Sequence, residues 1–408
     1  MKEIGNSYRG NTLNALQRRQ LLKRRLVYSL GALAYIAFDH AALAFCRPKS
    51  HPQRVALLYP DFLGDVLIWL PYGQSLANHL LREGKEVFVI CEEANRAVLE
   101  NAFGGWTVIG IHRANFNLTG PRRRAELLRR LRGLGVGRTI YMKYPRFTRK
   151  SAESFIEALG APAVAFEAAF RNRPRWEILW SNRRYERLVK TEGGRDTHVS
   201  IHFHAFLQAM KVDLREIVPA DLKVSSTQPI DDDYWVLAPG SGQKYRNWPA
   251  ERFATVARVL AANRPHWRCV IVGTASEHDL GTQIAVKLGG GALNLTGQTS
   301  VQQLIDLIAH ARLLLGNDSG AGHIAAALGT PAVVVVGGGH WGLCFPYPDN
   351  APVRRQPVVV GHRMACFGCD WICAHTTQTD KPFPCIEAVS VEAVWQQVKA
   401  LLSTSEGG

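Results

Sequence analysis

Short hydrophobic runs alternate with amphipathic stretches along most of the chain. The first runs, residues 55–59, 87–91, 108–111 and 139–143, contain few polar positions. Strands covered on both faces of a parallel sheet have this pattern, whereas half-exposed strands alternate between apolar and polar residues. Because stretches with helical spacing separate the runs, we expect a doubly wound α/β domain.

A second alternation of the same kind begins at Tyr234 and ends with an amphipathic helix over residues 390–402. Between the two alternations, residues 170–225 are basic, aromatic and less regular, apart from a helix expected over residues 198–210. Two doubly wound domains place the carboxyl ends of their strands across a cleft from each other, and ligands bind there. The expected division is a tail over residues 1–53, a first domain over residues 54–228 and a second over residues 229–408.

The tail differs from the rest of the chain. It has no acidic residue between Glu3 and Asp39, and a cluster of arginines and lysines precedes an apolar run over residues 26–45. The run is long enough to span a bilayer, but Asp39 inside it costs roughly 2.5–3.5 kcal/mol on insertion scales. A basic helix lying on anionic lipid fits the composition better, and a helix packed on the following domain is the plainer alternative.

The composition narrows the choice of partners. The chain of 408 residues has a formal net charge of +15. Such a charge favours an anionic partner: nucleic acid, a phosphorylated glycan or an acidic membrane. Because the sequence shows no zinc-finger, RNA-recognition or helix-turn-helix signature, we expect no nucleic-acid partner.

A glycine-rich loop in the second alternation predicts an anion site. Expected strands at residues 313–315 and 332–336 enclose the loop and a short helix over residues 321–328. The start of this helix directs free N–H groups and a positive dipole end at the loop, and glycine lets a ligand approach the backbone. A tight turn that needs glycine only for its geometry is the alternative. The loop residues concerned are Asn317, Asp318, Ser319, Gly320 and Gly322.

A carboxylate follows the first expected strand. Asp65 stands in the stretch LGDVLIWLP, where a helix is expected to begin. It is either a favourable charge in the first turn of that helix or a general base that accepts a proton from an incoming hydroxyl group. A helix N-terminus keeps a carboxylate ionised at neutral pH, as a base requires.

Two cations follow the first strand of the second alternation. Lys244 and Arg246 lie in a glycine-containing loop just before Trp248, where cationic side chains suit a diphosphate. The loop lacks the third glycine of a dinucleotide-binding fingerprint, and no Walker sequence occurs in the chain. Ordinary dehydrogenase or P-loop chemistry is therefore not expected.

Two further stretches give weaker signals. Thr296 and Gly297 form a loop before a helix that begins with a capping-box pattern, so structure explains most of this motif and a ligand role is secondary. The cations Lys143, Arg146 and Arg149 lie at and after the end of an expected strand. They form either a solvated basic surface or a contact for an anionic acceptor.

Four cysteines gather toward the C-terminal end of the chain. Cys366, Cys369 and Cys373 have the spacing CxxCxxxC, and Cys385 follows them. These thiols either bind a structural zinc ion or remain free or redox-paired. The uneven spacing of all eight cysteines in so long a chain does not indicate a secreted disulfide scaffold.

In their order, the motifs resemble glycosyltransferase family 9, the lipopolysaccharide heptosyltransferases. The resemblance covers about residues 54–402 and depends on the succession GDVL, PG…RNWPAERF, LTGQTS and GNDSGAGHIAAALGTP. It implies a GT-B architecture, with two Rossmann-like domains around a cleft, and inverting sugar transfer. The implied donor is a nucleotide-activated sugar, typically ADP-heptose, and the implied acceptor is a lipid-linked core oligosaccharide.

The resemblance also implies roles for single residues. Asp65 matches the catalytic base. The family's lysine before Trp–Pro is matched by Arg246, with Lys244 two residues earlier, so it stays open which cation holds the donor phosphate. A triple glycine from Gly337 replaces the family's Gly–Pro–Thr–Asp–Pro, which leaves the donor sugar and base open. The implied donor block consists of Asp318, Ser319, Gly320, Gly322 and His323, with Thr296 and Gly297 in the LTGQTS motif.

The implied reaction needs no cofactor, because helix N-termini and a cation can stabilise the leaving diphosphate. Nucleotide sugars are expected in the cytoplasm, so we expect the protein there, peripheral at the inner membrane, with an anionic glycolipid acceptor. One alternative is a related GT-B transferase that uses another nucleotide sugar on a different glycan. A non-catalytic nucleotide-sugar-binding protein at the membrane is the other.

Overall fold

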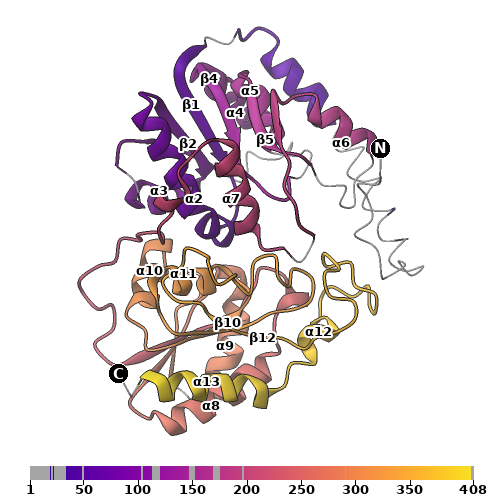
Figure 1. The fold of residues 1–408 in the computed structure, drawn as a ribbon. Coiled ribbons are helices and arrows are strands. Elements are labelled where there is room, and N and C mark those ends of the chain that lie inside the picture. Colours follow the sequence, from indigo (N-terminus) through magenta and orange to yellow (C-terminus); the bar gives the residue numbers. More distant parts are fainter. Residues whose placement is uncertain are drawn as a thin grey trace. The chain divides into compact units, whose positions relative to one another are not determined.

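The computed structural model describes residues 19, 22, 34–47, 50–102, 104–112, 120–146, 152–168, 175–194, 197–289 and 291–405. The chain divides into two compact units, each built around its own parallel sheet. The N-terminal unit contains Arg18–Gly193 and Val199–Val218, and the C-terminal unit contains Gly194–His198 and Pro219–Gly408. Figure 1 labels the elements of both units.

The sheet of the N-terminal unit has six parallel strands in the order β3–β2–β1–β4–β5–β6. Strand β1 lies inside the sheet, and Ala56 pairs with Phe88 of β2 on one side and Thr139 of β4 on the other. The strands are β1 (His51–Tyr59), β2 (Glu86–Glu92), β3 (Thr107–Ile111), β4 (Val136–Tyr141), β5 (Ala163–Phe166) and β6 (Arg187–Val189).

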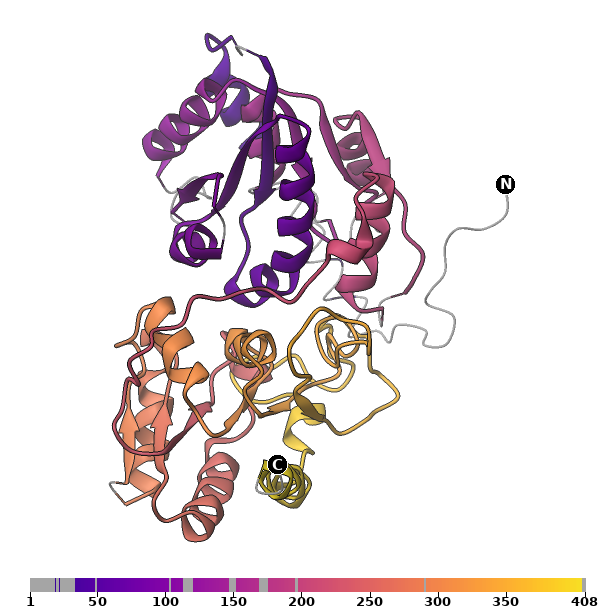
Figure 2. The same ribbon diagram turned by 60° about the vertical axis from the view of Figure 1, so that its left-hand side comes forward.

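Helices cover both faces of this sheet. Side chains at alternate positions of β1 point to opposite faces, so Ala56 and Leu58 pack against α4 and α5, whereas Tyr59 stacks on Trp69 of α2 with ring centroids 4.7 Å apart. Helix α7 lies beside α2 (Figure 2). The helices are α2 (Leu63–Arg82), α3 (Arg96–Ala102), α4 (Pro121–Gly133), α5 (Ala152–Leu159), α6 (Arg175–Asn182) and α7 (Val199–Ala209), with the short turns η1 (Glu93–Asn95) and η3 (Leu214–Glu216).

The described part of the apolar run at residues 26–45 packs on the N-terminal unit. Residues 34–43 are helical, and Leu43 joins the core beside Leu128 of α4. Asp39 forms a fully buried ion pair with Arg124 of α4, with an Nη2–Oδ2 distance of 2.7 Å. Among the described residues, no helix is long and apolar enough to cross a membrane. Residues 26–33 lie outside the described part, and residues 34–43 follow the plainer alternative of a helix packed on a domain.

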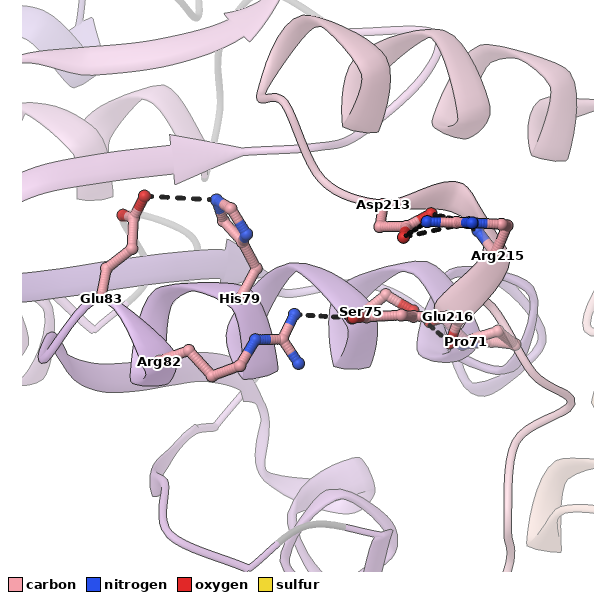
Figure 3. Close-up of polar contacts among 8 residues, drawn as sticks. All are labelled: Pro71, Ser75, His79, Arg82, Glu83, Asp213, Arg215 and Glu216. Atoms are coloured by element: carbon pink, nitrogen blue, oxygen red, sulfur yellow. Dashed lines mark hydrogen bonds and ion pairs between the residues drawn. The ribbon is translucent and has the colours of Figure 1, made fainter.

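The segment after α7 returns along α2, as the close-up in Figure 3 shows. The Ser75 hydroxyl lies 2.9 Å from the Pro71 carbonyl oxygen and 3.3 Å from that of Glu216. Nη2 of Arg82 donates to the Glu216 carboxylate at 2.6 Å. These contacts tie η3 to α2, so residues 213–216 are held on the N-terminal unit although the chain leads on to the other unit.

The C-terminal unit contains a second parallel sheet of six strands, in the order β12–β11–β10–β7–β8–β9. Counted within each unit, both sheets place the first strand beside the second and the fourth, which is the Rossmann order. The strands are β7 (Tyr234–Ala238), β8 (Arg268–Ile271), β9 (Ala292–Asn294), β10 (Leu314–Asn317), β11 (Ala332–Val335) and β12 (Val358–Val360).

Helices α8 and α13 lie side by side against one face of the second sheet (Figure 1). Helix α10 begins with the expected capping box, in which Ser300 and Gln303 each bind the other's backbone N–H group. The two doubly wound sheets confirm the predicted α/β class. The helices are α8 (Ala250–Asn263), α9 (His278–Lys287), α10 (Val301–Ala309), α11 (Gly320–Leu328), α12 (Pro384–Glu387) and α13 (Val391–Ser405), with the short turns η4 (Lys244–Arg246) and η5 (Ala275–Glu277).

Candidate functional site

The predicted site residues collect at corresponding places in the two sheets. In a doubly wound sheet the connections run in opposite directions from the first and fourth strands, and ligands bind at the carboxyl ends of these neighbouring strands, the switch point. In the N-terminal unit these strands are β1 and β4, and in the C-terminal unit they are β7 and β10. Each switch point carries a cluster of charged side chains, and each cluster is described within its own unit.

At the N-terminal switch point, one ammonium group bridges two carboxylates. Nζ of Lys143, just after β4, lies 2.9 Å from Oδ1 of Asp65 and 2.5 Å from Oδ2 of Asp61. Asp65 stands in the first turn of α2, and Asp61 in the loop between β1 and α2. The side chain of Asp65 is 31% exposed, that of Asp61 21% and that of Lys143 only 9%. The carboxylate predicted to be a base is therefore reachable from solvent, whereas its cation is enclosed.

Burial and mutual attraction compete within this cluster. Burial by itself would lower the pKa of Lys143, but the carboxylates of Asp61 and Asp65 raise it well above its ordinary value. Burial raises the pKa of Asp61, and the negative charge of Asp65 raises it further, against the effect of Lys143. Lys143 therefore stays charged at neutral pH, and the basic character of the cluster resides on the two carboxylates.

The structure excludes a solvated surface for two cations of the basic stretch after β4. Lys143 is held by the two carboxylates and does not form part of a solvated surface. Arg146 is buried too: Nη1 lies 2.7 Å from Glu153, and Nε donates to the Phe166 carbonyl oxygen at 2.8 Å. Its guanidinium therefore binds groups inside the unit, and a contact with an acceptor stays a prediction. Arg149, the third predicted cation, lies outside the described residues.

At the C-terminal switch point, one guanidinium pairs with one carboxylate. Nη2 of Arg246, at the end of η4, lies 2.8 Å from Oδ2 of Asp318, which follows β10. Burial by itself would raise the pKa of Asp318, but the positive charge of Arg246, helped by His323 and His340, lowers it below its ordinary value. The predicted cation and the predicted loop carboxylate are thus bound to each other.

Asn317 fixes the backbone around this pair. Its amide Nδ2 donates to the Pro239 carbonyl oxygen at 2.5 Å, and its Oδ1 accepts from the Trp248 N–H group at 3.0 Å. The side chain is fully buried, so both bonds are shielded from water. One asparagine at the end of β10 thereby holds both ends of the loop that carries Lys244 and Arg246.

Donor groups without a partner surround the start of α11. Ser319 is the N-cap of this helix but its side chain makes no capping bond. Nε of Arg246 and Nε1 of Trp371 are buried and have no hydrogen-bond partner among the described residues. The guanidinium of Arg246 lies over the Trp371 ring, 5.2 Å from its centroid. Unpartnered N–H groups beside a helix N-terminus are suited to an anion.

The other predicted donor residues divide into exposed and internal groups. The Lys244 side chain is exposed. His323 is buried, stacks on Phe345 and shares a 2.7 Å hydrogen bond with the Tyr347 hydroxyl, and burial lowers its pKa to about 4. It is therefore neutral at pH 7, and these contacts lie inside the unit.

The loop of Thr296 and Gly297 is occupied by its own contacts. Oγ1 of Thr296 donates to the Asn294 side chain at 2.7 Å, and the Gly297 N–H group donates to the Gly273 carbonyl oxygen at 2.8 Å. Gly297 has φ +75°, a conformation that favours glycine. In the donor block, Gly322 is close-packed: a Cβ there would lie 3.1 Å from Val334.

Two residues of these clusters were not predicted from the sequence. Asp61 stands four residues before Asp65, in the same loop-to-helix segment, and this spacing was the available signal. Trp371 gave no signal, because only the fold brings the segment after β12 to Arg246.

The four cysteines do not form the predicted metal site. All of them are free thiols, and no group of three or more His, Cys, Asp or Glu side chains in the described part of the chain is arranged to hold a metal ion. Burial raises the pKa of Cys369 to about 12. Instead, Sγ of Cys385 accepts a hydrogen bond from the Gly338 N–H group at 3.4 Å, so Cys385 packs against the glycine loop after β11.

Comparison with known proteins finds sequence similarity to sugar transferases. The model of "Glycosyltransferase family 9 (heptosyltransferase)" matches residues 168–357. Lipopolysaccharide heptosyltransferase 2 of Salmonella typhimurium is 30% identical over 146 residues, which are 35% of this chain and 40% of that protein. The Escherichia coli K12 protein of the same name is 33% identical over 114 residues, 27% of this chain and 32% of that protein. These alignments span about a third to two fifths of the curated relatives.

Solved structures show the same fold over most of the chain. The Escherichia coli ADP-heptose lipopolysaccharide heptosyltransferase II has a TM-score of 0.60 at 18% identity, covering 87% of this chain and 100% of that one. Together with the family match, this likeness confirms the predicted GT-B type of fold and the resemblance drawn from the motifs. The chain is thus similar to the heptosyltransferases of glycosyltransferase family 9 in sequence over residues 168–357 and in fold over most of its length.

Proposed function

We propose that this protein is an inverting glycosyltransferase that moves a sugar from a nucleotide sugar to a lipid-linked acceptor. The proposed donor is ADP-heptose, and the sugar transferred is heptose. The observation that carries the proposal is the partly exposed carboxylate of Asp65 at a switch point, held in place by Lys143. The match of residues 168–357 to the heptosyltransferase family model supports the choice of donor, as does the ADP-heptose in the name of the Escherichia coli structural relative.

In the proposed reaction Asp65 is the catalytic base. An acceptor hydroxyl group gives its proton to the Asp65 carboxylate as its oxygen attacks the anomeric carbon of the sugar. The bond from that carbon to the diphosphate breaks, and the electron pair leaves with the nucleoside diphosphate. Attack from the face opposite the leaving group inverts the sugar configuration.

The C-terminal unit would stabilise the leaving diphosphate. Negative charge grows on the diphosphate oxygens as the bond breaks, and preorganised donors stabilise such charge without rearranging. The open N-terminus of α11 and Nε of Arg246 are suitable donors. Asp318 is already paired with Arg246, and a carboxylate would repel a diphosphate, so we assign it to orienting the guanidinium. The mechanism assigns no step to a metal ion.

The acceptor we propose is an anionic glycolipid at the cytoplasmic face of the inner membrane. Helix α4 supports a membrane-facing surface, because its exposed arginines form no ion pair with any described residue. Each such cation near an anionic surface contributes about 1 kcal/mol. Phe45, close in sequence to the helix that packs on α4, is 98% exposed. The arginines are Arg122, Arg123, Arg129 and Arg130.

Co-sedimentation with lipid vesicles tests the membrane surface. We expect binding to phosphatidylglycerol vesicles, no binding to phosphatidylcholine vesicles, and a loss of at least about fivefold in affinity for the double variant Arg129→Gln/Arg130→Gln. Equal binding of the variant and the unchanged protein would remove α4 from the membrane surface. Failure of the unchanged protein to bind either vesicle would remove the membrane partner.

Transfer assays with a panel of nucleotide sugars, ADP-heptose among them, and a heptose-deficient lipopolysaccharide acceptor test the reaction. We expect Asp65→Asn to lower kcat by roughly 100- to 10,000-fold, because the amide cannot accept the proton. Asp279→Asn is the matched control: it changes an exposed aspartate in the first turn of α9, another helix. The control should keep full activity.

Three results would change the proposal. Full transfer by Asp65→Asn would show that this carboxylate is only a favourable charge at a helix start. Transfer from a different nucleotide sugar in the panel would keep the mechanism and replace the donor. Binding of nucleotide sugars by the unchanged protein without transfer to any acceptor would favour a binding protein.

A further inference from the structure

The cation beside the proposed base is shared with a second carboxylate, and this sharing has a chemical consequence. Lys143 donates to Oδ1 of Asp65 and also contacts Oδ2 of Asp61, so one positive charge faces two negative charges. A carboxylate bound to a lysine by itself is a weak base, because protonation would break a favourable ion pair. The second carboxylate offsets this effect.

We propose that Lys143 and Asp61 are positioning residues for Asp65: Lys143 holds Oδ1 so that Oδ2 is presented to the acceptor hydroxyl, and Asp61 balances the charge of Lys143 so that Asp65 stays basic. This inference rests on the proposed function, because it presupposes Asp65 as the base. It replaces the predicted role of Lys143 as an acceptor ligand.

The three charged side chains determine the charge of the cluster, because the phenols beside them are neutral. Among the described residues, Tyr59 of β1 and Tyr141 of β4 also interact with Asp61 and Lys143, and burial raises the pKa of both phenols, so they stay neutral. The ring of Tyr59 lies 5.8 Å from Nζ of Lys143 and supplies an apolar wall with a weak attraction for the cation. With both carboxylates ionised, the cluster carries one net negative charge.

The geometry also separates the two carboxylates by role. Asp65 lies in the first turn of the long helix α2 and has the more exposed side chain of the pair. Asp61 accepts from the Phe62 N–H group at 2.9 Å through Oδ1, and its Oδ2 faces Lys143, so both of its oxygens are engaged. Each oxygen of Asp61 thus already has one contact, whereas Asp65 meets Lys143 through Oδ1, and its Oδ2 has no hydrogen bond or ion pair with the described residues.

The pH dependence of kcat/KM tests this division, because opposite substitutions should move it in opposite directions. Asp61→Asn removes a negative charge, so that Asp65 becomes the one carboxylate of the cluster that binds Lys143. The acidic limb of the pH profile should therefore move down by roughly one pH unit. Lys143→Gln removes the positive charge from two carboxylates, so the acidic limb should move up by a similar amount. Both variants should also lose activity at pH 7.

Two further variants complete the design. Lys143→Arg keeps the charge and can still bridge two carboxylates, so its limb should stay near that of the unchanged protein. Arg138→Gln changes an exposed cation toward the amino end of β4, which pairs with Glu186 and lies away from the cluster, and it should change neither rate nor profile. Circular dichroism spectra of all variants should be recorded to check that they are folded.

The outcomes separate failure of this inference from failure of the proposed function. If Asp65→Asn abolishes transfer but Asp61→Asn and Lys143→Gln leave the acidic limb in place, or move it the same way, the positioning role is wrong and the base assignment stands. If Asp65→Asn keeps full activity, both fail. If Lys143→Gln raises KM for the acceptor without any shift in the profile, Lys143 is an acceptor ligand after all.

Discussion

The two switch points use the same strand order with the charges exchanged. In the N-terminal unit the loop after the first strand supplies the carboxylates, Asp61 and Asp65, and the fourth strand leads to the cation, Lys143. In the C-terminal unit the loop after the first strand supplies the cation, Arg246, and the fourth strand leads to the carboxylate, Asp318. One topology therefore presents opposite charge patterns, and loop residues decide which.

The ratio of charges differs as well. Two carboxylates share one ammonium group in the N-terminal unit, which leaves a net negative charge suited to accepting a proton. One carboxylate matches one guanidinium in the C-terminal unit, and the N-terminus of α11 adds partial positive charge, which suits an anion. A switch point therefore determines where a ligand site lies, whereas the number of charges of each sign determines whether the site suits a proton or an anion.

The largest effect that would test this contrast comes from removing the cation of the C-terminal unit. Arg246→Gln leaves Asp318 buried without its partner, so we expect a loss of about 3–5 kcal/mol in unfolding free energy. It also removes a charged donor, so affinity for ADP should fall roughly 10- to 100-fold. Chemical denaturation and titration calorimetry measure the two effects.

Lys244→Gln is the matched control for this change. The Lys244 side chain is exposed and two residues away, so affinity for ADP should change less than about threefold. If the Lys244 variant lost affinity and the Arg246 variant kept it, the phosphate contact would belong to Lys244. The C-terminal switch point would then not bind the anion through Arg246, and the contrast between the two switch points would be wrong.

A smaller effect concerns acid stability. The pKa of buried His323 is about 4 in the folded protein and about 6.5 when unfolded, so the unfolded state binds the proton more readily. Stability contributed by neutral His323 is complete above pH 6.5 and is lost as the pH falls from 6.5 to 4, by about 3 kcal/mol. In the N-terminal cluster, Asp61 has a raised pKa, so its contribution to stability instead rises as the pH falls.

Hydrogen exchange followed by mass spectrometry reads the units separately. Between pH 6.5 and 4.5 the C-terminal unit should lose protection more steeply than the N-terminal unit. His323→Gln should flatten this dependence by about half, because the pKa of buried His198 in the same unit is also about 4. An unchanged slope in the variant would show that His323 is not the group responsible.

The fold could be predicted from the sequence where hydrophobic runs are long enough to be distinct. Buried runs such as Val87–Cys91 and Ala332–Val336 predicted strands that the structure contains. The strands β5, β6 and β12, of four, three and three residues, were not predicted. Shortness alone does not explain this, because β11 has only four residues and was predicted.

The sites were predicted as residues rather than as contacts. Asp65, Arg246 and Asp318 were identified from their positions after strands, and each lies at a switch point. The pairing of Lys143 with two carboxylates, and the burial of Arg146, depend on side chains from segments about 80 and 20 residues apart, as in the contacts Lys143–Asp65 and Arg146–Phe166. The local sequence pattern holds no information about such contacts. Lys143 and Arg146 therefore looked like free cations in the sequence, although the fold pairs both with carboxylates.

The buried pair of Asp39 and Arg124 determines where a smaller version of this protein could start. Arg124 is fully enclosed, and its carboxylate partner comes from a helix that precedes the first strand of the sheet. Removing that helix would take away the carboxylate that Arg124 binds in the interior beside α4, at a cost of about 3–5 kcal/mol. A fragment cut at the first strand, where the hydrophobic pattern becomes regular, would thus lack part of its own interior. Residues 34–43 therefore belong to the smallest folding unit, whatever precedes them in the chain.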